Sequence, residues 1–325
     1  MKIIYRAQIR QVIFISISAS WLYLYFSKVH TLANRNGSAG HFAKNTSLKD
    51  RAVPLEPRSS CALTVVTAYF RIPNKFSHAH YVSWMSNFLT LKSCLIIFTD
   101  NLSNFEALDP SSLVLIQVNL RQRVYEVFNL SEEFWIQQVE IDPEKDIHKG
   151  MELYWVWALK THFVAEAARR NEFSSDYFMW LDIGVFRDDR FLNKDIRSLR
   201  PPSDFDNNSV YYGCPYQFDP SDLYVDASGK CMTDFSHKNR LAGGIFVLHK
   251  SVAFEWFEVY KDTLYEYKYR TWFAGKDQNV LATACIEFPT ICTIVPSDGA
   301  PGNEWYTLIY YMFGLMPHAR PRHLR

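Results

Sequence analysis

An isolated carboxylate follows one of the most apolar stretches of this chain. Residues 177–181 (YFMWL) are apolar or aromatic, and Asp182, Ile183 and Gly184 come directly after them. At the carboxyl end of a buried strand, an acid can hold a divalent cation or a sugar hydroxyl, and a glycine lets a diphosphate approach the backbone. The competing interpretation is that Asp182 caps the next turn by accepting from a backbone N–H. The pattern predicts either a binding site or a turn at this position.

Lys160 and a glycine pair are further candidates for the same site. Lys160 falls inside the apolar stripe of a helix expected at about 150–170. Its ammonium either reaches the surface along the alkyl stem or points at the carboxyl end of the sheet, where it would neutralise a departing diphosphate. Gly243 and Gly244 open a later apolar strand. They indicate a β-bulge, a close approach of the backbone to a ligand, or both.

Three more acids have two interpretations each. Asp277 begins a predicted helix together with Gln278. An acid there stabilises the helix dipole. The alternative, contact with an acceptor or action as a base, is what the family resemblance given below implies for this position. Asp188 and Asp189 lie six and seven residues after Asp182. We interpret them as an exposed acidic turn, with a second cation ligand as the alternative.

The elements that must position these residues alternate along the chain. Apolar runs predict strands at 62–70, 94–100, 113–120, 177–181, 243–250 and 292–296. Helical spacing is found at 81–93, 150–170, 251–268 and 276–286. Residues 190–240 are polar and are expected to be irregular. Strands alternating with helices predict an α/β sheet with parallel connections, whose ligands bind outside the carboxyl ends of the strands.

Several motifs taken together resemble one family. The chain is similar to the HtrL/YibB family, the WlaTC/HtrL-type glycosyltransferases, in "LTVVTAYF", "CLIIFTD", "YFMWLDIGVFRD", "LAGGIFVLHK" and "GKDQNVLATACIEFP". The resemblance covers most of residues 62–315. It implies a GT-A-like fold, meaning a Rossmann-type mixed sheet flanked by helices, as a single domain over 61–325. It also implies a transferase that moves a sugar from a nucleotide-sugar donor to a glycan or glycoprotein acceptor.

The resemblance carries residue roles with it. It implies catalysis by Asp277 and Lys160, a Mn²⁺ or Mg²⁺ ligand at Asp182, and donor binding by Asp182, Gly184, Lys160, Gly243, Gly244 and Gln278. GT-A enzymes hold metal and diphosphate with a D-x-D motif, whereas the third position here is Gly184. This departure predicts weaker metal dependence, or a further metal ligand from elsewhere in the chain. It also makes a membrane-tethered carbohydrate-binding protein without turnover the alternative function.

The N-terminal segment predicts a membrane anchor. Three basic residues within positions 1–10 precede an uncharged apolar run from Gln11 to Phe26. That bias places the N-terminus in the cytoplasm and the body across the membrane, with a cleaved signal peptide as the alternative. We therefore expect a single-pass type II protein of the Golgi or ER with a cytoplasmic tail at 1–10, a span at 11–27, a flexible stem at 28–60 and a lumenal body.

Net charge bears on possible partners, whereas the sequons and cysteines are consistent with that location. The formal net charge is +1, which gives no electrostatic argument for nucleic acid as a partner. Sequons occur at Asn36, Asn45, Asn101, Asn129 and Asn207. Six cysteines follow the apolar run, and we expect the pairs Cys61–Cys94, Cys214–Cys231 and Cys285–Cys292, one of 15 connectivities. The first pair would begin two neighbouring parallel strands, and the last would close a short loop.

The topology is testable by glycosylation. Because the sequons would lie on the lumenal side, we expect glycosidase treatment of the expressed full chain to increase its gel mobility. The matched control carries Asn→Gln at all five sequons and should migrate like the treated parent. An unchanged parent whose body is cut by protease added from the cytosolic side would contradict the predicted orientation.

Overall fold

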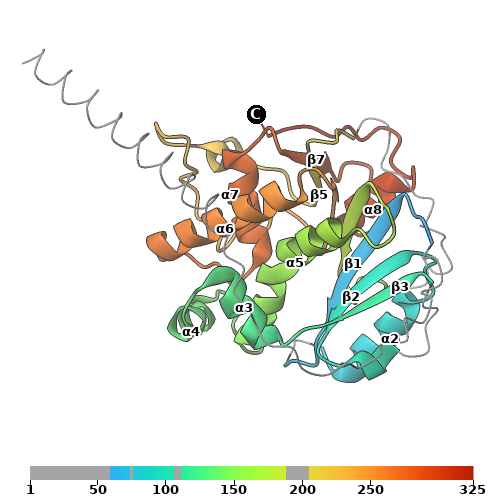
Figure 1. Ribbon diagram of the computed structural model, residues 1–325. Coiled ribbons are helices and arrows are strands. Elements are labelled where there is room, and N and C mark those ends of the chain that lie inside the picture. The colour runs from blue at the N-terminus through green and yellow to red at the C-terminus, as the bar shows by residue number, and fades with distance from the viewer. Residues whose placement is uncertain (1–58, 74–75, 106–110, 188–204, 325) are drawn as a thin grey trace, which may run out of the picture. The chain divides into compact units, whose positions relative to one another are not determined.

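A mixed sheet of seven strands runs through the described residues of this computed structural model, which are 59–73, 76–105, 111–187 and 205–324. The strand order is β3-β2-β1-β4-β6-β5-β7. Figure 1 labels β1, β2 and β3 side by side. The strands are β1 (Leu63–Tyr69), β2 (Cys94–Thr99), β3 (Leu113–Gln117), β4 (Tyr177–Leu181), β5 (Val210–Cys214), β6 (Ile245–His249) and β7 (Cys292–Pro296). The expectation of a mixed sheet is confirmed.

The direction of β6 departs from the expected parallel connections. β1 pairs in parallel with β2 and β4, β2 with β3, and β5 with β7, whereas β6 lies antiparallel between β4 and β5. Parallel neighbours require a crossover, usually a helix. Residues 215–244 connect β5 to β6 with a short 3₁₀ turn (Pro220–Leu223) and no α-helix, so the chain can return antiparallel. β5 itself was not predicted, because its five residues lie within the polar region at 190–240 that was expected to be irregular. In the structure all five are buried.

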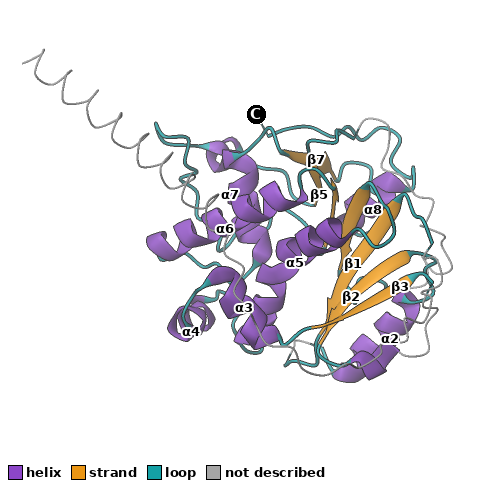
Figure 2. Ribbon diagram, viewed as in Figure 1, coloured by secondary structure: helices purple, strands orange, loops and turns teal. Residues whose placement is uncertain are grey.

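Helices cover both faces of the sheet (Figure 2). One face carries α3 (Leu120–Phe128), α4 (Glu132–Ile141), α5 (Met151–Arg170), α6 (Ala253–Arg270) and α7 (Asp277–Glu287). The other carries α2 (His78–Phe88) and α8 (Thr307–Met312). Alternate residues of each strand therefore enter two separate cores, with Trp180 in the first and Leu181 in the second. α3 and α4 begin at the side-chain caps of Asn119 and Ser131 and were not predicted from the sequence.

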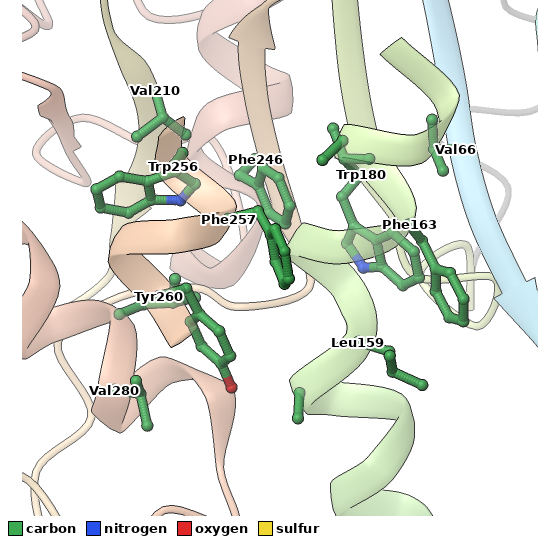
Figure 3. Packing of buried hydrophobic residues seen from close by; sticks show 14 of the residues in the cluster. Val66, Leu159, Phe163, Trp180, Val210, Phe246, Trp256, Phe257, Tyr260 and Val280 are labelled. Atoms are coloured by element: carbon green, nitrogen blue, oxygen red, sulfur yellow. The ribbon is translucent and has the colours of Figure 1, made fainter. Parts of the chain in front are cut away.

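Aromatic packing fixes α5 against the middle of the sheet. Phe163 of α5 stacks on Phe98 of β2 with ring centroids 4.3 Å apart, and it also stacks on Trp180 of β4 (Figure 3). These rings are almost completely buried. Truncating such an aromatic costs about 3–5 kcal/mol, so the register of α5 on the sheet is strongly determined. Lys160, one turn before Phe163, is positioned by the same packing.

Two of the three expected disulfides are present. Cys61–Cys94 joins the start of β1 to the start of β2, and Cys285–Cys292 joins α7 to β7, with Cα separations of 6.2 Å and 5.0 Å. The parallel pairing of β1 with β2 is the reason that the first two cysteines meet.

The expected Cys214–Cys231 pair is wrong. Cys214 ends β5 and donates its thiol to the carbonyl of Tyr216, whereas Cys231 forms an isolated β-bridge with Val225. Both cysteines are buried free thiols that face different backbone segments. Burial raises the pKa of Cys214 to about 12 and also raises that of Cys231, so both stay protonated and unreactive.

Several sequence predictions fall on residues that the structure does not describe. The tail, the span at 11–27 and nearly all of the stem lie outside the described residues, as do Asn36, Asn45, Asp188 and Asp189. None of the helices in the described ranges combines the length and apolarity that crossing a bilayer requires. The other sequon asparagines, at positions 101, 129 and 207, are exposed.

The two disulfides should contribute unequally to stability. Cys61–Cys94 closes a loop of 33 residues, so loop-closure entropy predicts that Cys61→Ser with Cys94→Ser lowers the free energy of unfolding by about 4 kcal/mol. Cys285–Cys292 closes a loop of 7 residues, and Cys285→Ser with Cys292→Ser should lower it by about 2 kcal/mol. Denaturant unfolding measures both free energies. Peptide mapping of the unreduced protein should recover Cys214 and Cys231 as free thiols, and a peptide that links them would contradict the assignment.

Candidate active site

A cleft of about 450 Å³ opens at the carboxyl ends of β1 and β4. The chain runs outward from β1 to β2 and β3 and then returns to the other side of β1 as β4. Such a reversal of strand order leaves a crevice above the sheet, because the connections leave in opposite directions. All the residues predicted to bind the donor or catalyse the reaction line this cleft: Lys160, Asp182, Gly184, Gly243, Gly244, Asp277 and Gln278.

An ammonium between two carboxylates forms the base of the cleft. Lys160 Nζ lies 2.9 Å from Asp277 Oδ2 and 3.2 Å from Asp182 Oδ1, and it donates to the carbonyl of Gly243 at 3.0 Å. Two carboxylates and a carbonyl thus surround the ammonium, which has three N–H donors. The Lys160 side chain is 3% exposed. We call Asp182, Lys160 and Asp277 the triad.

The triad keeps Lys160 charged. Burial alone lowers the pKa of Lys160, but the charges of Asp182 and Asp277 outweigh this effect and raise the pKa above its usual value. Burial raises the pKa of Asp277; Lys160 opposes that increase, and the charge of Asp182 adds to it. Lys160 is thus an ammonium at neutral pH, with Asp277 as its buried partner.

The glycine pair makes room for the triad carboxylates. A Cβ atom on Gly243 would lie 2.7 Å from both carboxylate oxygens of Asp277, and a Cβ on Gly244 would lie 2.9 Å from Asp182 Oδ2. Real Cβ atoms do not approach oxygens this closely, so any other residue would displace the acids. The sequence indicated a β-bulge, a close approach to a ligand, or both at these glycines, and this packing role was not predicted.

Gly184 also has a packing role. Its Cβ would lie 3.1 Å from Tyr81 Cε1 and 3.2 Å from Trp84 Cε3, both on α2. The turn after β4 therefore passes directly over two aromatic side chains. Although Gly184 lines the cleft, this close contact with α2 is sufficient reason for a small residue at the position.

Asp182 is the member of the triad that is open to the cleft. Its carboxylate accepts from Trp180 Nε1 at 2.7 Å and from Lys160, and its side chain is 40% exposed, against 6% for Asp277. Its backbone N–H continues the sheet by donating to Gly244 at 2.9 Å. The side-chain oxygens therefore face the cleft and do not cap a turn. Trp180 was missed, although a residue two positions earlier lies on the same side of a strand.

The described residues do not fit a divalent cation at Asp182. The ammonium of Lys160 lies within 3.4 Å of both oxygens of this carboxylate, so a dication would be placed beside a fixed positive charge. In the described ranges, no three histidine, cysteine, aspartate or glutamate side chains are grouped so that they could hold a metal. The Mn²⁺ or Mg²⁺ ligand set expected from the resemblance is therefore not formed by these residues.

Gln278 is held by the connection between β5 and β6. Its amide donates to Asn239 Oδ1. The two neighbours of Asn239 in sequence pair with buried Asp222, whose carboxylate lies 2.5 Å from Lys238 Nζ and 2.8 Å from Arg240 Nε. Burial opposes ionisation of Asp222, but the hydrogen bond from Lys238 and the other contacts lower its pKa, so it stays charged. This irregular segment thus forms an ordered wall beside the start of α7.

Fold and site define an α/β protein whose cleft contains a buried ammonium between one buried and one open carboxylate. The chain belongs to the family described as "Bacterial protein of unknown function (HtrL_YibB)", whose model matches residues 61–309. No curated protein matches the chain. A solved galactosyltransferase, LgtC, in complex with donor and acceptor sugar analogues, is 16% identical with a TM-score of 0.35, over 67% of this chain and 69% of that chain. No functional assignment rests on that likeness.

Removal of the ammonium should destabilise the protein. Lys160→Met leaves Asp277 buried without a cation, so we expect the free energy of unfolding at neutral pH to fall by about 3 kcal/mol. Without Lys160, Asp277 binds its proton more tightly in the folded state than in the unfolded chain. The deficit should therefore be largest at high pH and shrink as the pH falls through the raised pKa of Asp277.

Two variants control this measurement. Adding Asp277→Asn to Lys160→Met removes the unpaired charge and should abolish the extra pH dependence. Lys261→Met removes an ammonium whose partner, Glu258, lies on the surface of α6, and it should change stability by less than about 1 kcal/mol. If Lys160→Met behaves like Lys261→Met in chemical denaturation across pH, the triad does not contribute as described.

Proposed function

We propose that this protein is a glycosyltransferase that moves a sugar from a nucleotide-sugar donor to a glycan or glycoprotein acceptor. The observation that carries the proposal is the position of Asp182, an open carboxylate at the switch point of the sheet, oriented by Trp180 and Lys160. An oriented carboxylate in a crevice suits hydroxyl-rich ligands, because it accepts strong hydrogen bonds from their O–H groups. The GT-A-like resemblance of the family motifs supports the same class.

Within this proposal, Asp182 contacts the donor sugar. Glycosyl transfer develops positive charge on the sugar ring, as in glycoside hydrolysis, and a fixed carboxylate nearby stabilises that charge. With both acids ionised, the triad has an excess of one negative charge. The Asp277 side chain is only 6% exposed and forms an ion pair with Lys160, so we assign it to holding the ammonium and not to removing the acceptor proton.

A carbohydrate-binding protein without turnover is the second candidate. It is favoured by one observation, namely that Asp182 is the triad's accessible acid and the described residues place no metal-binding group of acids around it. Donor hydrolysis separates the two candidates, because a transferase slowly releases free nucleotide from its donor and a binding protein does not.

We further propose the type II arrangement, with the span at 11–27, the stem at 28–60 and a lumenal body in the Golgi or ER. Exposed sequons at Asn101, Asn129 and Asn207 support it, since each is accessible to a modifying enzyme. Two disulfides in the described residues also support it, because disulfides persist in oxidising compartments.

Asp182→Asn should separate folding from turnover. The change keeps the side-chain shape and removes the charge, so we expect donor turnover to fall by about 100-fold or more, the typical effect of losing one electrostatic contact in the transition state. The measurement is nucleotide release by the full chain from a panel of nucleotide sugars, with thermal unfolding to verify the fold.

The matched control is Asp176→Asn. Asp176 directly precedes β4 at its other end, where its side chain is 60% exposed and pairs with Lys250. This variant should keep the parental rate. Equal rates for folded Asp182→Asn and the parent would refute the role of Asp182. Failure of every donor to react with the parent would favour the carbohydrate-binding alternative.

A further inference from the structure

Two guanidinium groups in the cleft have no acidic partner among the residues that the structure describes. Arg71 follows β1 and Arg187 follows β4, and both side chains line the cleft and are exposed. Among the described residues, neither forms an ion pair with a carboxylate. An arginine stays protonated at any physiological pH. The cleft therefore contains two permanent positive charges that the protein's described acids do not neutralise.

Arg187 is held in place by aromatic rings. Its guanidinium carbon lies 4.6 Å from the ring centroid of Trp84 and 4.9 Å from that of Phe76, and Nε donates to the carbonyl of Gly184 at 3.3 Å. Cation–π contacts hold the guanidinium plane without using its N–H donors. One of the five donors is used by Gly184, so the others are available to a ligand. Such a fixed planar fork matches the oxygens of a phosphate.

The remaining charges of the cleft are already paired. Lys160 forms ion pairs with Asp277 and Asp182 and donates to the carbonyl of Gly243, and its side chain is 3% exposed, so its charge is already compensated by the protein. Lys276 forms an ion pair with Glu144. The available positive charge of the cleft is consequently that of Arg71 and Arg187, while Asp182 supplies an open negative charge.

This separation of charge suits a ligand with two chemically different ends. A sugar diphosphate has an anionic end that requires cations and a neutral end rich in hydroxyl donors. Arg187 and Asp182 both lie in the segment after β4, five residues apart, and both line the same cleft. The ammonium of Lys160 lies within 3.4 Å of both oxygens of Asp182, so a dication at this acid would be repelled by a neighbouring positive charge.

We infer that the protein binds the diphosphate of its donor through Arg71 and Arg187 without a divalent cation, while Asp182 accepts from the sugar hydroxyls. This inference rests on the proposed function, because it assumes a nucleotide-sugar donor. It replaces the metal expected from the resemblance with two side chains of the chain itself, and it limits Lys160 to positioning Asp182.

The test is calorimetric titration of the full chain with the 5′-diphosphates of uridine, guanosine, cytidine and adenosine, in EDTA and in Mn²⁺. We expect at least one of them to bind, with a Kd that differs less than about threefold between the two conditions. Arg187→Met and Arg71→Met should each weaken that binding by about 10-fold or more, since each removes a charge-assisted contact. Affinity should also fall as salt is added.

Arg121→Met is the matched control. Arg121 also lies over an aromatic ring, that of Tyr125, but it is on α3 and does not line the cleft. This variant should bind like the parent. Arg187→Lys keeps the charge and loses the planar fork, so it should have intermediate affinity.

The outcomes distinguish the inference from the proposed function. Binding that weakens 10-fold or more in EDTA overturns the metal-free inference and leaves a nucleotide-sugar transferase standing. Metal-independent binding that Arg187→Met and Arg71→Met do not change overturns the assignment of the arginines. Absence of binding by all four diphosphates under both conditions overturns the inference together with the proposed donor class. The comparison of EDTA with Mn²⁺ uses the parent protein, so it does not depend on the folding of any variant.

Discussion

The ammonium of Lys160 is the constraint on which the arrangement of the cleft depends. A lysine buried in an α/β core is costly unless its charge is compensated, and here Asp277, Asp182 and the Gly243 carbonyl compensate it. The same ammonium draws together three segments far apart in sequence: α5, the end of β4 and the start of α7. Aromatic packing of α5 on the sheet fixes the position of the charge, and the charge fixes the acid that faces the cleft.

Much of this organisation was predictable from local pattern. Apolar runs located β1 and β4, and the acid after β4 indicated a site because strand ends in such sheets face ligands. The pairing of Cys61 with Cys94 followed from placing two parallel strands side by side. Lys160 was conspicuous because a charge interrupted an apolar stripe, although its fully buried environment could not be read from that stripe.

The remainder depended on contacts between distant segments. The reversed direction of β6 follows from a connection without an α-helix, and the separation of Cys214 from Cys231 follows from how that connection folds. Arg187 carried no signal, since an arginine after an apolar strand is common. Its significance arises only from Trp84 and Phe76, about a hundred residues earlier, and from the absence of an acidic partner among the described residues.

The contact of Gly243 with Asp277 has a consequence for related sequences. Because a side chain at position 243 would collide with the carboxylate at 277, the two positions cannot vary independently. A relative that carries alanine or a larger residue at 243 must have moved or shortened the residue at 277, and its lysine equivalent to Lys160 would then lose its buried partner. The residues at positions 160, 243 and 277 should therefore vary together. From sequence alone, they distinguish family members that retain this group of charges from those that have lost it.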